Sequence, residues 1–541
     1  MEQGCCSMRI PVIYLIFSSI WMVIFWVGGI GVPLGNLFSI AFHAGGWNFF
    51  EDTVLLSILT MTAGQAILST LISAAGGFFL GLFLGEQVSE DPKSRVPMLL
   101  ALPFGVPTLV VAMAWVAWLG RSGVLASWGI HFDWVYSLKA VVFAHAFLNV
   151  PWIALAVCQS RRHVPEEQLA AARLLGAGYF SELRFVVWPQ VRWAFAEACA
   201  QVMSFCTTSF ALVLILGGGP PVQTLETELY GRLRYGFLDL SGAAICAFWQ
   251  LLITLFPWAL ILFFYDRNHR SLRPTISQKV RPQKEVKKRY RIGLVLIALG
   301  FTAPYGIVLK SQVLKIFIDS EQRSQVLSPF FLSLQLAGWS GLFSVFSAVM
   351  AVLFLRVGSN CFPAVSTFQA GLRVLFSLPS GLSSLVMGLA FFLSYGQWVD
   401  PFEGSFIAMV LLQTVLFFPV SFRVLSPVIR GLQIHQLEAA VSLGASGMKA
   451  FWWIEWPRWR GPLVGAFAGV AGASLGEIGA VSFFSSEKLI PLPLVVSRWM
   501  EHYRFEEAQG IAGLLFLLSM SLIFISFEVG NFSWERSIGL Q

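Results

Sequence analysis

The amino-acid sequence predicts an all-α polytopic membrane protein of about 12 transmembrane helices, arranged as two parallel six-helix repeats. Three observations lead to this prediction: the composition, the number of long apolar segments and a motif that occurs twice. Of the 541 residues, 56% are hydrophobic and only 12% are charged, whereas charged residues make up about a quarter of a typical soluble domain. The 49 Phe and 20 Trp suit a surface that faces lipid. This composition excludes an ordinary soluble domain.

A membrane-spanning helix needs about 20 consecutive, mostly apolar residues, and we count about twelve such segments. The first is too long for a signal-peptide core and lacks a convincing cleavage site, so we interpret it as a retained membrane helix. The tenth segment, which contains Pro419, and the glycine-rich eleventh have the weakest patterns. The expected segments are 10–32, 55–85, 97–119, 137–159, 194–216 and 242–265 in the first half, and 292–309, 329–355, 372–395, 405–425, 462–484 and 510–529 in the second.

Basic residues in the short loops predict the orientation of the chain. The expected loops at 33–53 and 396–404 contain no Lys or Arg, whereas the stretch 267–291 contains ten. The two loops that carry the repeated motif are basic as well. We therefore expect both termini, both motif loops and the central linker in the cytoplasm. Four arginines, at 232, 234, 498 and 504, fall in expected outer loops and weaken the asymmetry without reversing it.

The repeated motif lies at 168–177 and again at 436–445, 268 residues later. Each copy predicts a short helix with a smooth face of Leu and Ala, which Gly176 or Gly444 can end in a left-handed conformation. A proline follows each glycine after thirteen residues. Six spans per half give both halves one orientation, so the halves are parallel repeats. The expected domains are a first transmembrane half at 1–265, a basic cytoplasmic linker at 266–291 and a second transmembrane half at 292–541.

The pattern Glu-Ala-Ala, three residues, Gly and then thirteen residues to Pro resembles the coupling-helix loop of binding-protein-dependent ABC importer permeases. The second copy matches it fully, whereas the first has Ala170 in place of Glu, and Glu166 and Glu167 one turn earlier could substitute. The resemblance covers essentially the whole chain, and it implies that each loop docks in a cleft of an ATP-binding subunit. The residues that it assigns to coupling are Ala170, Ala171, Ala172, Gly176, Pro189, Glu438, Ala439, Ala440, Gly444 and Pro457.

Two shorter strings resemble particular branches of that family. The segment 209–230, with three consecutive glycines, is similar to the fused permeases of thiamine importers, and 474–480 is similar to both thiamine and ferric-iron permeases. A carboxylate within a membrane is costly, so Glu477 is either a pathway or gating group or half of a satisfied structural pair. Glycines in these segments favour close helix packing. The candidate pathway residues are Ser204, Thr207, Thr208, Ser209, Ser474 and Glu477.

The residues and the resemblance together predict the permease subunit of an ATP-driven ABC importer in the bacterial inner membrane. Thiamine or a thiamine phosphate is the first substrate hypothesis and ferric iron the second. The expected partners are two copies of an ABC ATPase subunit, an extracytoplasmic solute-binding protein and the lipid bilayer, with no nucleic acid. The chain has no Gly-x-x-x-x-Gly-Lys-Ser/Thr phosphate loop, so ATP hydrolysis is expected in a separate subunit.

We expect no catalytic residues, no cofactor and no metal site, because the seven cysteines lack metal-ligand spacing and the seven histidines are scattered. Two alternatives from other functional classes stay open. A secondary transporter can also have two parallel six-span halves, but it would be expected to carry ion-coupling groups in its spans, and few are present here. A membrane scaffold without a transport path is the third class. Neither alternative explains the two motif loops.

Overall fold

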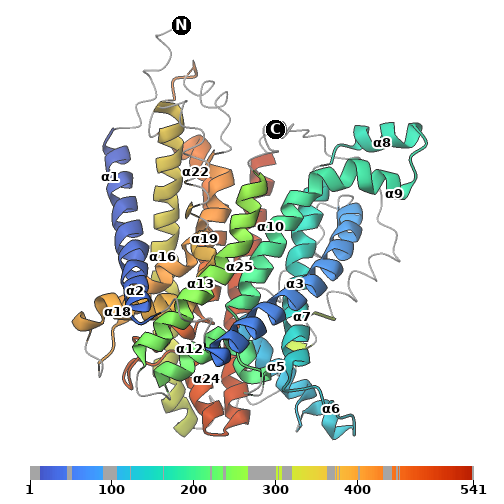
Figure 1. Cartoon of the computed structure of the whole chain (residues 1–541). Coiled ribbons are helices and arrows are strands. Elements are labelled where there is room, and N and C mark those ends of the chain that lie inside the picture. Colours follow the sequence, from blue (N-terminus) through green and yellow to red (C-terminus); the bar gives the residue numbers. More distant parts are fainter. Residues whose placement is uncertain are drawn as a thin grey trace. The chain divides into compact units, whose positions relative to one another are not determined.

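The computed structural model confirms an all-α polytopic protein: among the residues that it describes, every regular element is a helix (Figure 1). Eight of these helices are long and apolar enough to span a membrane. The described residues are 12–45, 52–88, 106–121, 123–162, 164–217, 219, 222–234, 239–265, 300–301, 304–306, 320–361, 372, 375–376, 378–399, 403–430, 442–445, 449 and 451–538.

The chain forms two compact units, and each of them takes its residues from both ends of the division. Unit 1 combines Met1–His43 with Gln312–Gln541, and unit 2 is Ala44–Ser311. In unit 1, the indole of Trp21 donates a hydrogen bond to Ser347 Oγ at 3.2 Å. In unit 2, the indole of Trp118 donates to the carbonyl of Pro304 at 3.1 Å. The first segment of each sequence half therefore packs within the other half's unit, while the boundaries of the two sequence repeats stay a prediction.

Unit 2 is built around three helices, α3, α7 and α10, which pack closely through small residues. A Cβ on Gly77 would come within 2.6 Å of Ile153, and one on Gly81 within 2.6 Å of Val157. Glycine at these positions lets the backbones of α3 and α7 approach. The elements of unit 2 are α3 (Thr53–Val88), α5 (Thr108–Leu119), α6 (Val124–Ser127), α7 (Leu138–Arg162), α8 (Glu166–Leu174), α9 (Tyr179–Glu182), η3 (Leu183–Val187), α10 (Trp188–Thr207), α11 (Ala211–Leu216), α12 (Leu225–Arg234) and α13 (Leu240–Tyr265).

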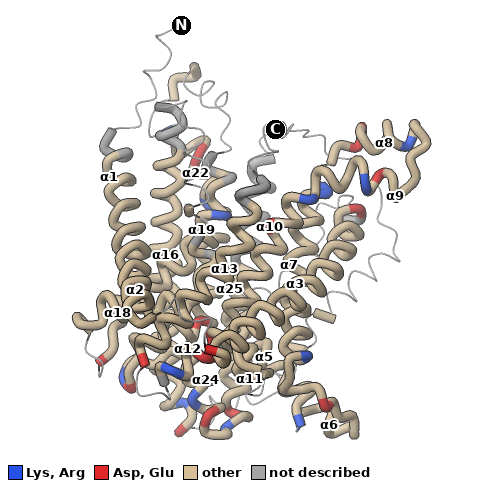
Figure 2. Tube along the Cα trace, viewed as in Figure 1, with Lys and Arg blue, Asp and Glu red and all other residues tan. Residues whose placement is uncertain are grey.

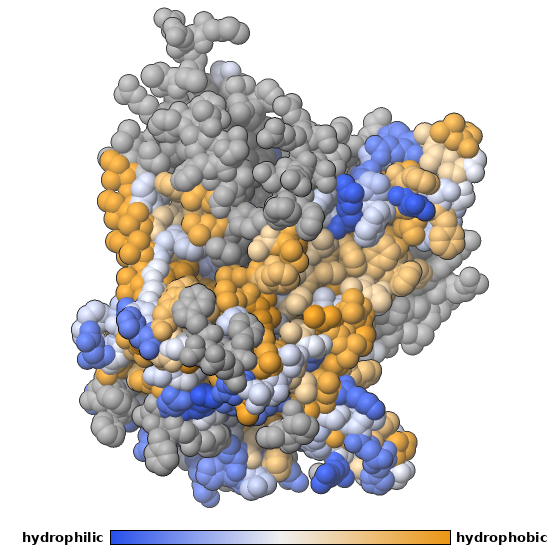
Figure 3. Space-filling view, in the orientation of Figure 1, coloured by the Kyte–Doolittle hydropathy of each residue, from blue (hydrophilic) through white to orange (hydrophobic). Residues whose placement is uncertain are grey.

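Unit 1 has an aromatic core, in which Phe418 of α19 packs on Phe25 at a centroid distance of 4.9 Å and on Phe422 at 5.8 Å. On the outside of α1, large apolar side chains such as Ile20 and Val23 are exposed, as expected for contact with lipid (Figure 3). The elements of unit 1 are α1 (Val12–Val23), η1 (Ile24–Gly31), α2 (Val32–His43), α16 (Ser320–Cys361), η6 (Leu378–Gly381), α18 (Ser384–Tyr395), η7 (Gly396–Trp398), α19 (Phe406–Arg430), η8 (Phe451–Glu455), α22 (Trp456–Ser474), α23 (Gly479–Ser482), α24 (Leu492–Glu501) and α25 (Phe505–Ile538).

Three short π-helical segments, η1, η3 and η8, each end two residues before a proline, at Pro33, Pro189 and Pro457. A proline has no N–H for the carbonyl four residues earlier, and its ring crowds that carbonyl. The wider π turn moves the carbonyl aside and lets the helix continue. The first helical run therefore extends to His43, about ten residues beyond the expected end at 32. In η1, the freed carbonyl of Gly28 accepts a hydrogen bond from the Tyr395 hydroxyl at 2.6 Å.

The fifth and eleventh expected spans are broken helices. The first is divided between α10, which ends at Thr207, and α11, which begins at Ala211; the second is divided between α22, which ends at Ser474, and α23, which begins at Gly479. These ends correspond under the 268-residue offset to within one residue. By contrast, α7 and α19 run on through Pro151 and Pro419, so the tenth span is formed despite its proline. Most of the seventh expected span, 292–309, lies outside the described residues.

Candidate functional site

The first motif loop consists of α8, α9 and η3, and it is anchored to unit 2 by a few buried apolar side chains. Leu169 of α8 is only 1% exposed and belongs to the same buried cluster as Val187 and Val191 at the start of α10. Gln190 of α10 donates a side-chain hydrogen bond to Gln168 at 2.7 Å. Charged side chains also gather on this loop, while α3 and α7 carry few along their length (Figure 2). The loop is thus a polar projection with one apolar anchor.

A glycine-dependent turn ends α8, as the sequence predicted. Gly176 has a φ of +80°, and Gly444 in the second motif has a φ of +81°. In the first copy, the N–H of Ala177 donates to the carbonyl of Ala172 at 3.0 Å and the N–H of Gly176 donates to Arg173 at 2.9 Å. An added Cβ would meet no atom within 4 Å at either glycine, so the backbone conformation alone requires glycine there.

A bidentate ion pair closes the bend between α8 and α9. The Arg173 guanidinium donates to Glu182 Oε1 at 2.7 Å and to Oε2 at 3.1 Å. The Arg173 side chain is 60% exposed and that of Glu182 only 12%. The hydrogen bond from Arg173 lowers the pKa of the Glu182 carboxyl, and the same contact raises the pKa of Arg173. At the equivalent positions 268 residues later, the chain has Val441 and Ala450.

The tip of the loop exposes large apolar side chains. Leu175 is 88% exposed and Phe185 is 71% exposed; the residues 268 positions later, Leu443 and Trp453, are 88% and 80% exposed. Apolar surface is visible at this tip beside hydrophilic surface (Figure 3). Exposed apolar groups repeated at the same two places of two loops indicate surfaces that another protein covers.

Of the residues that the resemblance assigned to coupling, the first copy is fully described. Ala170 and Ala171 are exposed on α8, Ala172 is half-buried and Pro189 is in the first turn of α10. In the second copy, Gly444 and Pro457 are described and occupy the same turn and helix start as their counterparts. Glu438, Ala439 and Ala440 lie outside the described residues.

The candidate pathway residues of unit 2 divide into two groups. Ser204 accepts a hydrogen bond from the Trp258 indole at 2.9 Å, and the Thr207 hydroxyl lies 3.2 Å from that of Thr254, so both hold α10 against α13. Thr208 and Ser209 lie at the break and are half-buried. The Thr208 hydroxyl donates to the carbonyl of Ser204 at 2.9 Å, a bond that competes with continuation of the helix.

Side chains of neighbouring helices satisfy the carbonyls that the break in unit 2 frees. Gln65 of α3 donates to the carbonyl of Cys206 at 2.7 Å, and Gln250 of α13 donates to that of Thr207 at 2.6 Å. A broken helix is tolerated at membrane depth when its backbone groups have such partners. These two glutamines have roles that the sequence analysis missed. Each stands in an apolar helix, and that contrast was the available signal.

In unit 1, the break carries Glu477 at the position equivalent to Ser209. Its Oε1 accepts a hydrogen bond from the N–H of Ala480 at 3.1 Å, at the start of α23. Ser474 donates to the side chain of Gln413 at 2.7 Å, which ties the end of α22 to α19. Ser474 therefore has a packing contact, whereas Glu477 is half-buried at the break itself.

A family model matches this chain twice, at residues 77–278 and 344–529, which together are more than half of its length; its description is binding-protein-dependent transport system inner membrane component. The chain belongs to this family. Each match contains one motif loop and one broken helix. This inner membrane component is therefore a fused, two-half ABC permease of a transport system that depends on a binding protein.

Similar proteins of known assignment match this permease over nearly its whole length. It is 30% identical to the thiamine transport system permease protein ThiP of Haemophilus influenzae, with 90% of this chain and 91% of the relative covered. It is 27% identical to ThiP of Brucella abortus, with 91% and 92% covered. A probable sulfate transport system permease protein of Helicosporidium is 21% identical over 43% of this chain and 86% of its own length, as a single-half permease would be.

Proposed function

We propose that this permease forms the translocation path of an ATP-driven importer for thiamine or a thiamine phosphate in the bacterial inner membrane. One observation carries the ATP-driven part of the proposal. Leu175 with Phe185, and Leu443 with Trp453, are exposed apolar pairs at the same two places of two loops 268 residues apart. Two equivalent docking surfaces suit two copies of one partner, and the family pattern of these loops points to an ABC ATPase subunit.

The geometry of the first loop supports transmission of force rather than loose attachment. Leu169 anchors α8 in the core, and the Arg173–Glu182 pair closes the bend. A push on the exposed tip would therefore pass through η3 into α10, and α10 leads directly to the break at Thr208. Closure of the ATPase dimer would move both loops and so rearrange the two broken helices, which we propose line the path.

The topology of the proposal follows from the loops. If ATPases bind the motif loops, these loops and both termini are cytoplasmic, and the opposite ends of the long helices face the solute-binding protein. This agrees with the basic central linker, with ten Lys and Arg at 267–291. The substrate hypothesis rests on relatives: the thiamine permeases match about nine-tenths of the chain. Glu477 at the break suits the cationic thiazolium ring of thiamine, through opposite charge.

Reconstitution tests the proposal. The full-length permease is placed in proteoliposomes with its ATPase and its binding protein, and radiolabelled thiamine is added on the binding-protein side. Uptake should require ATP on the ATPase side and should stop when the binding protein is omitted. Uptake of ferric iron but not thiamine would reject the substrate and keep the importer. Uptake that follows a proton or sodium gradient and ignores ATP would reject the importer.

A further inference from the structure

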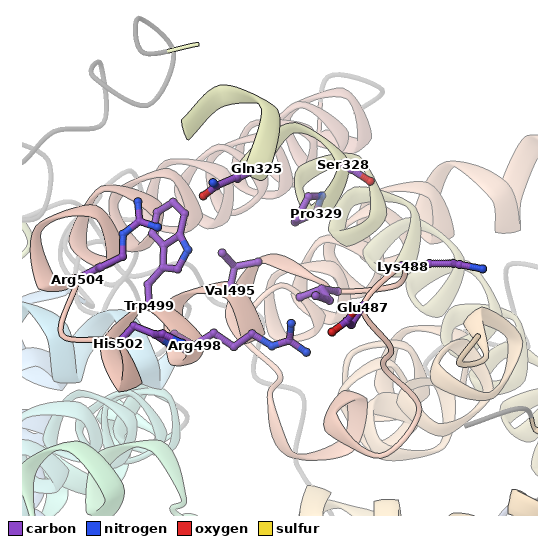
Figure 4. Close-up of a pocket in the computed structure, with 11 residues that line it drawn as sticks. Gln325, Ser328, Pro329, Glu487, Lys488, Val495, Arg498, Trp499, His502 and Arg504 are labelled. Carbon is purple, nitrogen blue, oxygen red and sulfur yellow. The ribbon is translucent and has the colours of Figure 1, made fainter. Parts of the chain in front are cut away.

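A cavity of about 440 Å³ lies at one end of unit 1, among the first turns of α16, the segment 487–490, α24 and the turn into α25 (Figure 4). Within this unit, α24 lies at the opposite end from the start of α1 (Figure 1). In the proposed topology, this end faces the solute-binding protein. Its walls carry more basic than acidic groups: Lys488, Arg498 and Arg504 against Glu487.

Two of the three basic groups are already engaged. Lys488 lies 3.6 Å from a carboxylate oxygen of Glu403. Arg504 pairs with Glu507 at 3.1 Å and stacks over the indole of Trp499 at 4.6 Å. The guanidinium of Arg498 is half-buried, and no side chain or backbone group among the described residues pairs with it. A half-buried guanidinium without a counterion favours an external anion, since its lost hydration is otherwise uncompensated.

A second observation at the same place points to a protein partner. Tyr503 has a φ of +60° and its side chain is 83% exposed. It occupies the turn where the N–H of Arg504 donates to the carbonyl of Trp499 at 2.8 Å, a position that usually takes glycine. A non-glycine residue held in this conformation costs free energy that the fold does not recover through packing of the ring. Tyrosine, tryptophan and arginine together are the residues that dominate the affinity of protein interfaces.

The corresponding end of unit 2 lacks these features. Helix α12 is the counterpart of α24, and in both units a hydroxyl of the long helix accepts a hydrogen bond from the first N–H: Thr62 from Leu225 at 2.9 Å, and Ser333 from Leu492 at 2.8 Å. In unit 2, however, Arg232 pairs with Glu228 at 2.7 Å and with Asp239 at 3.0 Å. Its charge is neutralised within the unit, so the unpaired cation is on unit 1.

We propose that the cavity beside Arg498 and Tyr503 is the docking site for an acidic side chain of the solute-binding protein, and that this anchor is confined to the second half of the permease. The inference rests on the proposed function. A carboxylate from the binding protein would pair with Arg498, and Tyr503 would cover the contact and exclude water. One-sided anchoring would fix which lobe of the binding protein faces which half, because the rest of the contact surface need not discriminate.

The test uses the full-length permease with its ATPase in nanodiscs. The probe is the thiamine-loaded binding protein that supports ATP-driven uptake in the reconstituted system, and its Kd is measured by interferometry at two salt concentrations. Arg498→Glu should raise the Kd about tenfold or more and flatten its dependence on salt. The matched control is Arg323→Glu, an exposed arginine of α16 that does not line the cavity. It should change the Kd less than about twofold.

Two further variants separate docking from folding. Tyr503→Gly keeps the turn and removes the ring, so it should weaken binding several-fold while leaving thermal stability unchanged or higher. A single acid-to-lysine change on the binding protein should restore affinity for the Arg498→Glu permease. Unchanged affinity for Arg498→Glu would overturn the inference. So would loss of bound anionic phospholipid from that variant, by native mass spectrometry, with the affinity for the binding protein intact. Failure of the unmodified complex to import thiamine would instead reject the proposed function.

Discussion

Arg173 donates two hydrogen bonds to Glu182 across the bend between α8 and α9, at 2.7 and 3.1 Å. The second motif loop has Val441 and Ala450 at these positions, so it lacks the pair, and it has Glu438 where the first loop has Ala170. The two loops therefore place their carboxylates differently. The first uses one to brace its own bend, and in our proposal the second presents one to the ATPase.

Removal of the brace should loosen the first loop. Glu182→Ala and Arg173→Ala should each weaken association with the ATPase about two- to fivefold, since Arg173 is 60% exposed and water screens the pair. The double variant should be no worse than either single variant, because the two side chains act as one contact. Association is measured with purified ATPase and permease in nanodiscs. Additive losses would show that the two residues act separately.

The same pair predicts a dependence on pH. The pKa of Glu182 is lowered by its hydrogen bond from Arg173, so the brace is complete above the ordinary carboxylate pKa and is lost as the pH falls through the lowered value. Hydrogen exchange of the amides at 174–178 should therefore show constant protection from neutral pH down to about pH 5, and a decline below it. In Glu182→Gln, protection should be low throughout. A decline of the same size in that variant would assign the effect to another group.

The exposed leucines should matter for docking and not for folding. Leu175→Ser and Leu443→Ser should each reduce ATP-driven uptake by about tenfold, as loss of an apolar contact at an interface does. Leu174→Ser is the internal control: Leu174 is 89% exposed, and its counterpart in the second loop is already Ser442. It should reduce uptake much less. Equal losses at Leu174 and Leu175 would mean that general apolar character, rather than the repeated position, is what the partner contacts.

The two motif glycines should respond to substitution in the same way. Gly176→Ala and Gly444→Ala place a Cβ at φ values of +80° and +81°, which should cost about 1–2 kcal/mol of local stability each. Gly178→Ala is the control, since Gly178 has a φ of −78° and an added Cβ would meet nothing within 4 Å. Limited proteolysis of the loops measures the effect. Cleavage of Gly178→Ala as fast as of Gly176→Ala would assign the effect to bulk.

The sequence predicted the elements that depend on local chemistry and composition. The motif helix, its left-handed glycine and the prolines at the starts of α10 and α22 follow from rules that act within a few residues, and Gly176, Pro189 and Pro457 are where they were expected. The breaks at Thr208 and Glu477 were not predicted, because apolar periodicity continues across them. The contacts that sustain the break in unit 2 come from Gln65 and Gln250, far away in sequence. The Arg173–Glu182 pair was also missed, since only the bend brings those residues together.

Glu477 gives the sharpest test of the path. Its Oε1 accepts the N–H of Ala480, and a glutamine side chain can make the same bond, so Glu477→Gln should leave the start of α23 intact. If the carboxylate attracts the cationic ring of thiamine, this variant should lower uptake by about tenfold or more at normal expression. Ser209→Ala changes the equivalent position of unit 2 without removing a charge and should lower uptake by less than about threefold. Binding protein affinity and ATPase association should stay at wild-type values in both variants. Full uptake by Glu477→Gln would restrict Glu477 to capping α23, whereas loss of uptake together with loss of expression, restored by Glu477→Asp, would assign it a structural role as a charged cap.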